Sequence, residues 1–303
     1  MTTNHSTPGV CGEENAIQQQ HTDASDAVKA IVLFVVITFA LSAVFIGAMV
    51  KLGAMEQLYV TAVMWMPAVG AFLTCALLKR PIASLPWAWG EWRWNIYAWS
   101  LPLLAGLVAY SIVWGFGLGG FPNMETVDAW ANQFGLRGAP AAVVITVGVV
   151  MLATAGIIGS LARALGEEIG WRGFLIWELR KLMPFWAVGI VSGVIWGLWH
   201  VPAILGTDYN AGTGNPVFQV ALFLANVITA SIIFAYFTFR ARSLWPAAIL
   251  HASHNLFVQA IYTPLTVFGS ETHKWVDEFG IMLPVIYGIL AIYFIRRARI
   301  DGL

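Results

Sequence analysis

The chain has 303 residues, of which 59% are hydrophobic and only 11% are charged, and its mean hydropathy is +0.74. A water-soluble domain carries about 25% charged residues, so a soluble fold of this composition would expose too much apolar surface. The 16 basic and 16 acidic residues give a formal net charge of zero, which argues against a nucleic-acid partner. The composition therefore predicts a chain whose main solvent is lipid.

The N-terminal segment, residues 1–26, is polar and lacks a basic stretch ahead of a short apolar run, so we interpret it as a disordered cytosolic tail. The apolar run that follows is long enough to cross a bilayer. Similar runs, separated by polar breaks, recur to the end of the chain. They predict spans at 28–50, 58–78, 95–118, 140–162, 185–205, 217–239, 244–266 and 281–296, with 163–181 continuing the fourth.

These runs predict an all-α, polytopic membrane protein with about eight transmembrane helices in one bundle, spanning residues 27–299. The runs are continuous rather than alternating, which is typical of helices and not of a membrane β-barrel. Eight spans place both termini on one side. With the N-terminus inside, all 16 basic residues except Lys51, Arg137 and Lys274 fall on the inner half. The positive-inside rule thus predicts a multi-pass protein of the cell membrane with both termini in the cytoplasm.

Ionisable residues inside the predicted spans are few. A charged group at membrane depth costs on the order of a few kcal/mol, so such residues tend to be functional or paired. Three short motifs contain them: Glu167-Glu168-Ile-Gly-Trp-Arg172, Trp196-Gly-Leu-Trp-His200 and His251-Ala-Ser-His-Asn255.

The spacing of these residues predicts which of them meet. Glu168 and Arg172 are four residues apart, so they share a helix face and can form an ion pair, whereas Glu167 points elsewhere. A hairpin turn at Pro184 places Glu167 and His200 at the same height. A carboxylate and an imidazole at one height can share a water molecule and move its proton. We expect this cluster in the inner half of the bilayer, open to cytosolic water.

The three motifs resemble the signatures of the CPBP family of intramembrane proteases, also called the ABI family, which includes the type II CAAX prenyl endopeptidases. The signatures of that family are Glu-Glu-x-x-x-Arg, Phe-x-x-x-His and His-x-x-x-Asn. They match here in order across about residues 150–260, with Trp196 in place of Phe at a position we interpret as packing. The resemblance implies an eight-helix bundle that hydrolyses peptide bonds.

The resemblance also implies roles for the matched residues. Glu167 would activate a water molecule with help from His200, and His251 and Asn255 would stabilise the oxyanion. The implied partners are the lipid bilayer and a peptide or protein substrate, lipidated or embedded in the membrane, that reaches the site from the cytosol or through lipid. No nucleic acid is expected.

The resemblance further implies that Glu168 and Arg172 support the site, although a purely structural ion pair would look the same in the sequence. No cofactor is required by this mechanism. A divalent metal such as zinc stays an alternative, because Glu167, His200 and His251 could form a three-ligand catalytic set. The sequence lacks His-Glu-x-x-His, the clearest helical zinc signature.

Two other functions stay open. The polar cluster could bind or transport an ion or proton, or the chain could be a non-catalytic scaffold or immunity-type protein with the same fold. His254 fits no family position, and we interpret it as packing or making a supporting hydrogen bond. Asp208 and the acidic stretch from Glu271 to Glu278 predict solvated outer loops.

Overall fold

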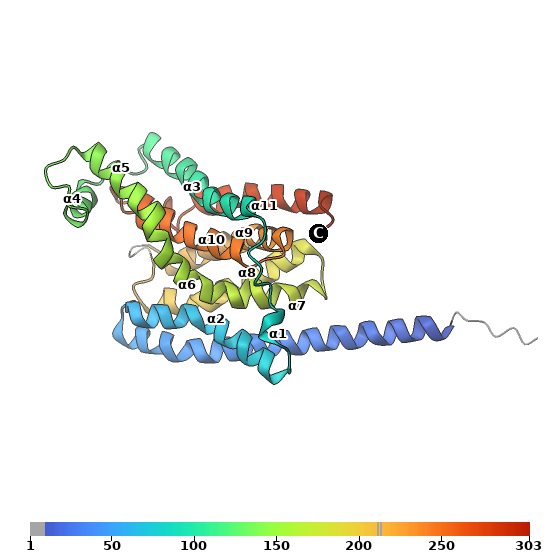
Figure 1. The fold of residues 1–303 in the computed structure, drawn as a ribbon. Helices are drawn as coiled ribbons and strands as arrows, with labels where there is room; N and C mark the ends of the chain where they lie inside the picture. The colour runs from blue at the N-terminus through green and yellow to red at the C-terminus, as the bar shows by residue number, and fades with distance from the viewer. Residues whose placement is uncertain (1–9, 211, 213) are drawn as a thin grey trace, which may run out of the picture.

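A computed structural model of the chain describes residues 10–210, 212 and 214–303, with side chains described from residue 23 onward. Three π-helical turns, Leu152–Gly156, Trp171–Leu175 and Asn255–Tyr262, join α5 to α6, join α6 to α7 and extend α10. The α-helices of this part of the chain, labelled in Figure 1, are α1 Val10–Leu52, α2 Gln57–Leu77, α3 Trp92–Gly115, α4 Met124–Gln133, α5 Ala141–Met151, α6 Ile157–Gly170, α7 Ile176–Arg180, α8 Phe185–Gly206, α9 Pro216–Ala241, α10 Trp245–His254 and α11 Met282–Ile300.

The predicted all-α membrane fold is confirmed, and each predicted span corresponds to a helical segment. Six of the described segments are long and apolar enough to cross a membrane: Asp23–Leu52, Gln57–Leu77, Trp92–Gly115, Ala141–Arg180, Phe185–Gly206 and Pro216–Ala241. Neither α11 nor α10 with its π-helical extension is among the six. The last turn of α11 carries basic residues, while α10 is buried on every side from Pro246 to His254, so protein rather than lipid surrounds it.

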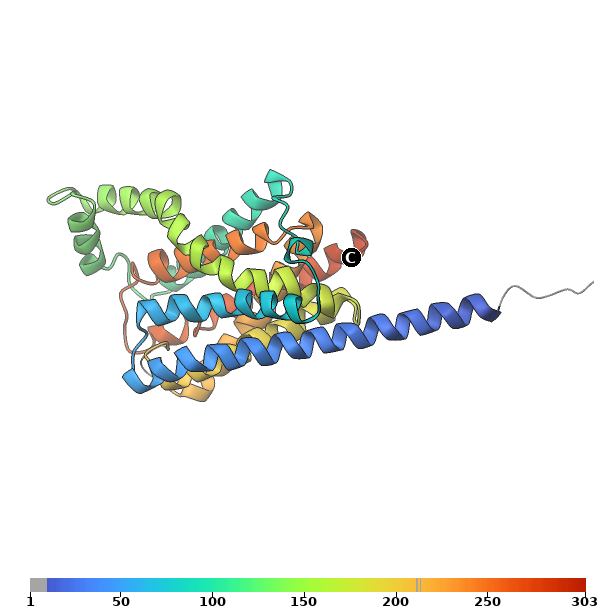
Figure 2. The same ribbon diagram turned by 60° about the horizontal axis from the view of Figure 1, so that its bottom comes forward.

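The N-terminal helix begins before the predicted membrane boundary. Because α1 starts at Val10, it overlaps the tail predicted for residues 1–26, of which residues 1–9 lie outside the described part of the chain. Figure 2 shows α1 extending well past the other helices. The polar-to-apolar change near Asp26 marks where lipid contact would begin, and the Glu, Gln and Ala residues before it still favour helix. The short helix α4 is also absent from the predicted spans.

The buried helix α10 lies at the centre of the bundle, packed against α3, α6 and α9 (Figure 1). Around it, α1 pairs with α2, α2 with α6, α8 with α9, and α9 with α11. The Ser160 hydroxyl on α6 donates to the Ala252 carbonyl on α10 at 2.9 Å. This bond joins the helix of the first motif to the helix of the third.

Glycines allow the closest helix contacts, as is common where helices pack within lipid. A Cβ on Gly170 of α6 would lie 2.6 Å from the carbonyl oxygen of Pro67 on α2. A Cβ on Gly193 of α8 would lie 2.7 Å from the Cα of Ile228 on α9. The backbones of α6 and α8, which carry the first two motifs, are thereby fixed against their neighbours.

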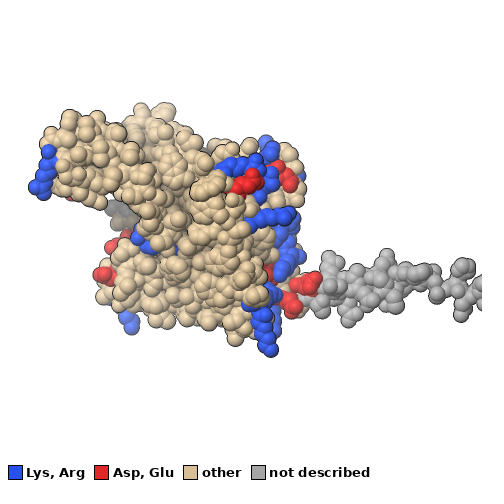
Figure 3. All heavy atoms as spheres, in the orientation of Figure 1, with Lys and Arg blue, Asp and Glu red and all other residues tan. Residues whose placement is uncertain are grey.

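Most basic residues gather at the end of the bundle from which α1 projects (Figure 3). We name this the basic end, and the other the opposite end. The helices α2, α7, α9 and α11 finish at the basic end, and α3 and α8 begin there. Its basic residues are Lys79, Arg80, Arg93, Arg180, Lys181, Arg240, Arg242, Arg296, Arg297 and Arg299.

Candidate active site

Side chains from all three motifs line one cavity of about 400 Å³ within the bundle. Glu167 comes from α6, His200 from α8 and His251 from α10, and Asn255 is the first residue of the π-helical turn after α10. Such π-turns are frequent at functional sites, since the extra residue re-aims the side chains around it. The four residues that sequence analysis assigns to water activation and oxyanion binding therefore share one cavity.

Two indole groups hold the carboxylate of Glu167. Trp196 Nε1–H donates to Oε2 at 2.7 Å, and Trp171 Nε1–H donates to the same oxygen at 3.3 Å. The other oxygen, Oε1, accepts a hydrogen bond from neither indole. It is therefore available to take a proton from a reactant. Trp196 stands where the related signature has Phe, so the position interpreted as packing also supplies a hydrogen bond.

Glu168 and Arg172 form an ion pair that is fully buried. Arg172 Nη1 lies 3.0 Å from Glu168 Oε1, and both side chains are 0% exposed. The other guanidinium nitrogen, Nη2, donates to Ser231 Oγ on α9 at 2.9 Å. The guanidinium also lies 4.2 Å from the ring centroid of Trp196 and 4.4 Å from that of Phe234, at cation–π distance. These contacts offset part of the cost of burying the charge.

His200 and His251 each have one ring nitrogen hydrogen-bonded to an acceptor. His200 Nδ1 lies 2.9 Å from the Trp196 carbonyl oxygen, and since a carbonyl only accepts, Nδ1 is protonated and Nε2 is left for a reactant. His251 Nδ1 lies 2.8 Å from Glu168 Oε1. A carboxylate in this position orients the imidazole and stabilises positive charge on it. Glu168 therefore connects Arg172 to His251.

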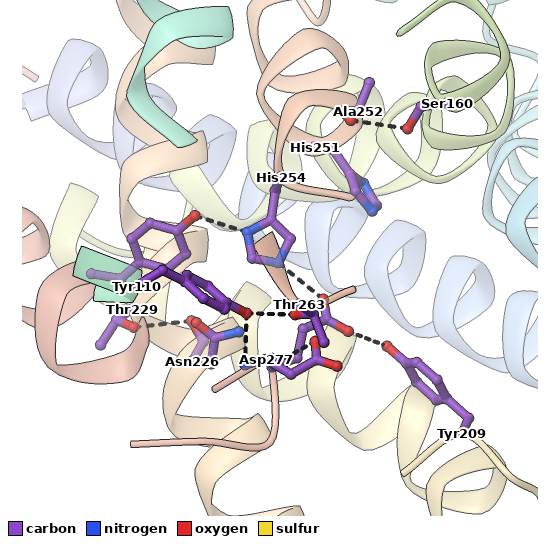
Figure 4. Close-up of polar contacts among 12 residues, drawn as sticks. Tyr110, Ser160, Tyr209, Asn226, Thr229, His251, Ala252, His254, Thr263 and Asp277 are labelled. Carbon is purple, nitrogen blue, oxygen red and sulfur yellow. Dashed lines mark hydrogen bonds and ion pairs between the residues drawn. The ribbon is translucent and has the colours of Figure 1, made fainter. Parts of the chain in front are cut away.

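His254 makes hydrogen bonds with both ring nitrogens, drawn in Figure 4. Nδ1 lies 2.8 Å from the Tyr287 hydroxyl on α11, and Nε2 lies 3.0 Å from Glu278 Oε1. The predicted supporting hydrogen bond is thus present. The prediction of a solvated acidic loop is wrong at Glu278, which is buried and also accepts from the Tyr209 hydroxyl at 2.7 Å.

The neighbouring Asp277 should make stability depend on pH. Burial, and then the charge of Glu278, raise the pKa of Asp277 from 3.8 to about 7. The folded chain therefore binds this proton more tightly than the unfolded chain. The stabilisation is complete below pH 3.8 and is lost as the pH rises through about 7. Asp277 has a φ of 64°, a conformation that Asn also tolerates.

We expect Asp277→Asn to raise the melting temperature in detergent at pH 8 relative to wild type. A shift of roughly 2–4 °C corresponds to about 1 kcal/mol in domains of 150–250 residues. The two proteins should differ less at pH 5, where wild-type Asp277 is protonated. Asp128→Asn, at an exposed carboxylate on α4, is the control and should follow wild type at both pH values. An Asp277→Asn curve that also follows wild type at both would contradict the prediction.

The cavity opens at the opposite end of the bundle. Its lining includes the exposed Gln57 and Asp208 and the loop residue Tyr209, which lie where α2 begins and α8 ends. The Asp208 carboxylate accepts from the backbone N–H of Met55 at 2.7 Å. The mouth therefore lies away from the basic end, and the expected opening to cytosolic water holds only if this opposite end faces the cytosol. Glu167 and His200 lie at similar sequence distances from Pro184, which sets their relative height in the bundle. This spacing does not determine which end of the bundle admits water.

In the part of the chain that the structure describes, no three His, Cys, Asp or Glu side chains are grouped so as to hold a metal ion. His251 Nδ1 is bonded to Glu168, His200 Nδ1 to the Trp196 carbonyl oxygen, and Glu167 Oε2 to the two indole N–H groups, so these bonds leave the other ring nitrogens and Glu167 Oε1 facing no such partner. No step proposed below passes through a metal.

Several residues around the site make contacts that the motifs did not predict. Sequence analysis missed Trp171 and Trp196 as donors, Ser231 as the partner of Arg172, and Asn226 on α9. Asn226 lines the cavity, and its buried Oδ1 has no hydrogen-bond partner within the described residues. A lone amide in an apolar span was the available signal for this residue. Indole and hydroxyl donors carry no such signal, since both residue types also serve as packing.

Comparison with known proteins covers the part of the chain that contains the motifs. Residues 149–257 match the family described as type II CAAX prenyl endopeptidase Rce1-like. A curated protein named CAAX prenyl protease 2, from Methanococcus maripaludis, is 30% identical over 99 residues, which are 32% of this chain and 36% of that protein. The chain thus spans about a third of the length of the curated relative it matches. Residues 149–257, which carry the three motifs within a helical membrane fold, are thus similar to the Rce1-like type II CAAX prenyl endopeptidases.

Proposed function

We propose that this protein is an intramembrane endopeptidase that hydrolyses a peptide bond with a water molecule activated by Glu167 and His200. The observation that carries the proposal is the convergence of Glu167, His200, His251 and Asn255 on one cavity. The family of the matched residues supports the same class of reaction.

The reaction begins with a water molecule between Glu167 Oε1 and His200 Nε2. Glu167 takes a proton as the water oxygen attacks the substrate carbonyl carbon. The oxyanion that forms accepts hydrogen bonds from the protonated Nε2 of His251 and from the Asn255 amide. That amide has no hydrogen-bond partner among the described residues. The proton then passes to the leaving amine, and the C–N bond breaks.

The substrate that fits the cavity is a peptide segment with apolar or lipidated side chains. The wall between the site and the mouth includes Met49, Val60, Met64, Phe223 and Val227. These side chains come from α1, α2 and α9, and they offer an apolar surface on which hydrocarbon can be buried. We therefore propose a membrane-embedded or lipidated peptide as the substrate.

A peptide library tests the proposed function. Purified wild type in detergent is incubated with peptides made with and without a farnesyl group, and products are read by mass spectrometry. Wild type should cleave a subset, and Glu167→Gln should not. If wild type cleaves nothing and Glu167→Gln changes proton or ion flux in liposomes, the transport function is supported instead. If Glu167→Ala and His200→Ala leave the cellular phenotype intact, a scaffold role is supported.

We further propose that the basic end faces the cytoplasm of the cell membrane, as the positive-inside rule indicates. The cavity mouth then faces outward. The test uses a chain free of its two cysteines, Cys11→Ser and Cys75→Ala. A membrane-impermeant maleimide should label Gln57→Cys at the mouth in intact cells, and label Arg299→Cys only after permeabilisation. The reverse pattern would place the mouth in the cytoplasm.

A further inference from the structure

One buried carboxylate connects the two histidine motifs at the mouth of the cavity. Glu278 lies in the loop between the π-helical turn after α10 and α11, and is 7% exposed. Its Oε1 accepts from His254 Nε2 at 3.0 Å, and its Oε2 accepts from the Tyr209 hydroxyl at 2.7 Å (Figure 4). Glu278, Tyr209 and His254 all line the cavity. The contact on one oxygen leads to the third motif, and the contact on the other leads to the second motif.

The first contact leads to the third motif. His254 directly precedes Asn255, at the point where α10 changes to the π-helical turn. With Nε2–H donating to Glu278, Nδ1 is the acceptor for the Tyr287 hydroxyl. Both ring nitrogens are thus engaged, and the ring is anchored from the loop and from α11. An anchored His254 holds the helix turn that presents His251 and Asn255 to the cavity.

The second contact leads to the second motif. Tyr209 follows the end of α8, and its ring centroid lies 6.2 Å from that of His200. The Tyr209 ring also contacts Phe223 at 6.0 Å and Phe279 at 5.4 Å. Burial and the charge of Glu278 raise the pKa of Tyr209 well above 10, so its hydroxyl stays a donor. The bond to Glu278 therefore keeps the Tyr209 ring beside His200.

The carboxylate stays charged in this arrangement. Burial opposes ionisation, yet the hydrogen bonds from His254 and Tyr209 help to lower the pKa of Glu278 to about 2. A charged acceptor makes hydrogen bonds that are roughly twice as strong as those of a neutral one. Both contacts are therefore available throughout the neutral pH range.

We propose that Glu278 is a positioning residue of the site, which holds Asn255 through His254 and holds His200 through Tyr209. The kinetic part of this proposal rests on the proposed peptidase function. Both oxygens of Glu278 are engaged by His254 and Tyr209, so in this arrangement Glu278 exchanges no proton with the attacking water. Its effect on the reaction is geometric, and a displacement of about 1 Å at a reacting group can cost on the order of 100-fold in rate.

Kinetics of three variants test the proposal. Glu278→Ala removes both contacts and should lower kcat by about 10- to 100-fold, with KM within about twofold. Glu278→Gln keeps an acceptor for Tyr209 and should lose less. Tyr209→Phe removes one contact and should lose about tenfold. Glu271→Gln changes an exposed carboxylate of the same loop and should match wild type. Wild-type kcat in Glu278→Ala, or a loss confined to KM, would overturn the proposal.

A spectroscopic readout does not depend on activity. The chain has six histidines, and ¹⁵N-histidine spectra in detergent report each ring. Glu278→Gln should shift the signals of His254 and His200, whereas Tyr209→Phe should shift mainly that of His200. If wild type cleaves no peptide, the proposed function fails and these shifts still decide the positioning role. A His200 signal unchanged in both variants would overturn it. If Glu278→Ala does not fold, Glu278→Gln and Tyr209→Phe provide the test.

Discussion

Replacing Arg172 with methionine is expected to lower the free energy of unfolding by about 3–5 kcal/mol, the cost of leaving one member of a buried ion pair unpaired. Glu168 is 0% exposed and would keep only the bond from His251 on Oε1. Its Oε2 has no partner within the described residues even in wild type. The loss is measurable as a shift in denaturation by sodium dodecyl sulfate in mixed micelles.

A double-mutant cycle separates the ion pair from simple packing. Arg172→Met combined with Glu168→Gln removes both charges, so the double variant should be more stable than Arg172→Met alone. Arg180→Met is the matched control, because this exposed arginine on α7 forms no ion pair within the described residues. It should change stability by less than about 0.5 kcal/mol. A double variant that loses the sum of both single effects would show that the two charges act independently.

The sequence was sufficient to predict the helices because the signals for them are local. Runs of apolar residues between polar breaks reflect the cost of transferring each residue into lipid, and the helices follow these runs. The pairing of Glu168 with Arg172 follows in the same way from helical periodicity. The small helix α4 was not predicted because it lies between two spans and adds no apolar run. Its local signal is the cap in which Asn123 accepts from the Glu125 N–H.

Features that depend on distant contacts could not be predicted. Tyr209 and Glu278 are separated by 69 residues, and only the closure of two loops shows that the acidic stretch ends inside the protein. The direction in which the cavity opens depends equally on how α1, α2, α8 and α9 meet. Hydropathy places residues at a depth in the membrane, and it carries no information about which end of the bundle is sealed.

The indole bond to Glu167 shows how one substitution in a motif can add function to a packing position. A phenylalanine at position 196 could contact Arg172 through its ring, as Trp196 does at 4.2 Å. It could not donate to Glu167. In this chain the second motif therefore contributes both His200 and a hydrogen bond that orients the carboxylate of the first.

Replacing Glu167 with glutamine is expected to lower kcat for peptide cleavage by about 10²–10⁴-fold, the usual contribution of a general base. The fold should be unaffected, because the amide oxygen can still accept from Trp196 and Trp171 while the neutral side chain cannot take a proton from water. KM should change little, since the loss falls on the transition state. Trp196→Phe, which keeps the ring and removes the 2.7 Å bond, should lose no more than about tenfold because Trp171 still holds the carboxylate. If Glu167→Gln kept more activity than Trp196→Phe, the base would have to be another group in the cavity.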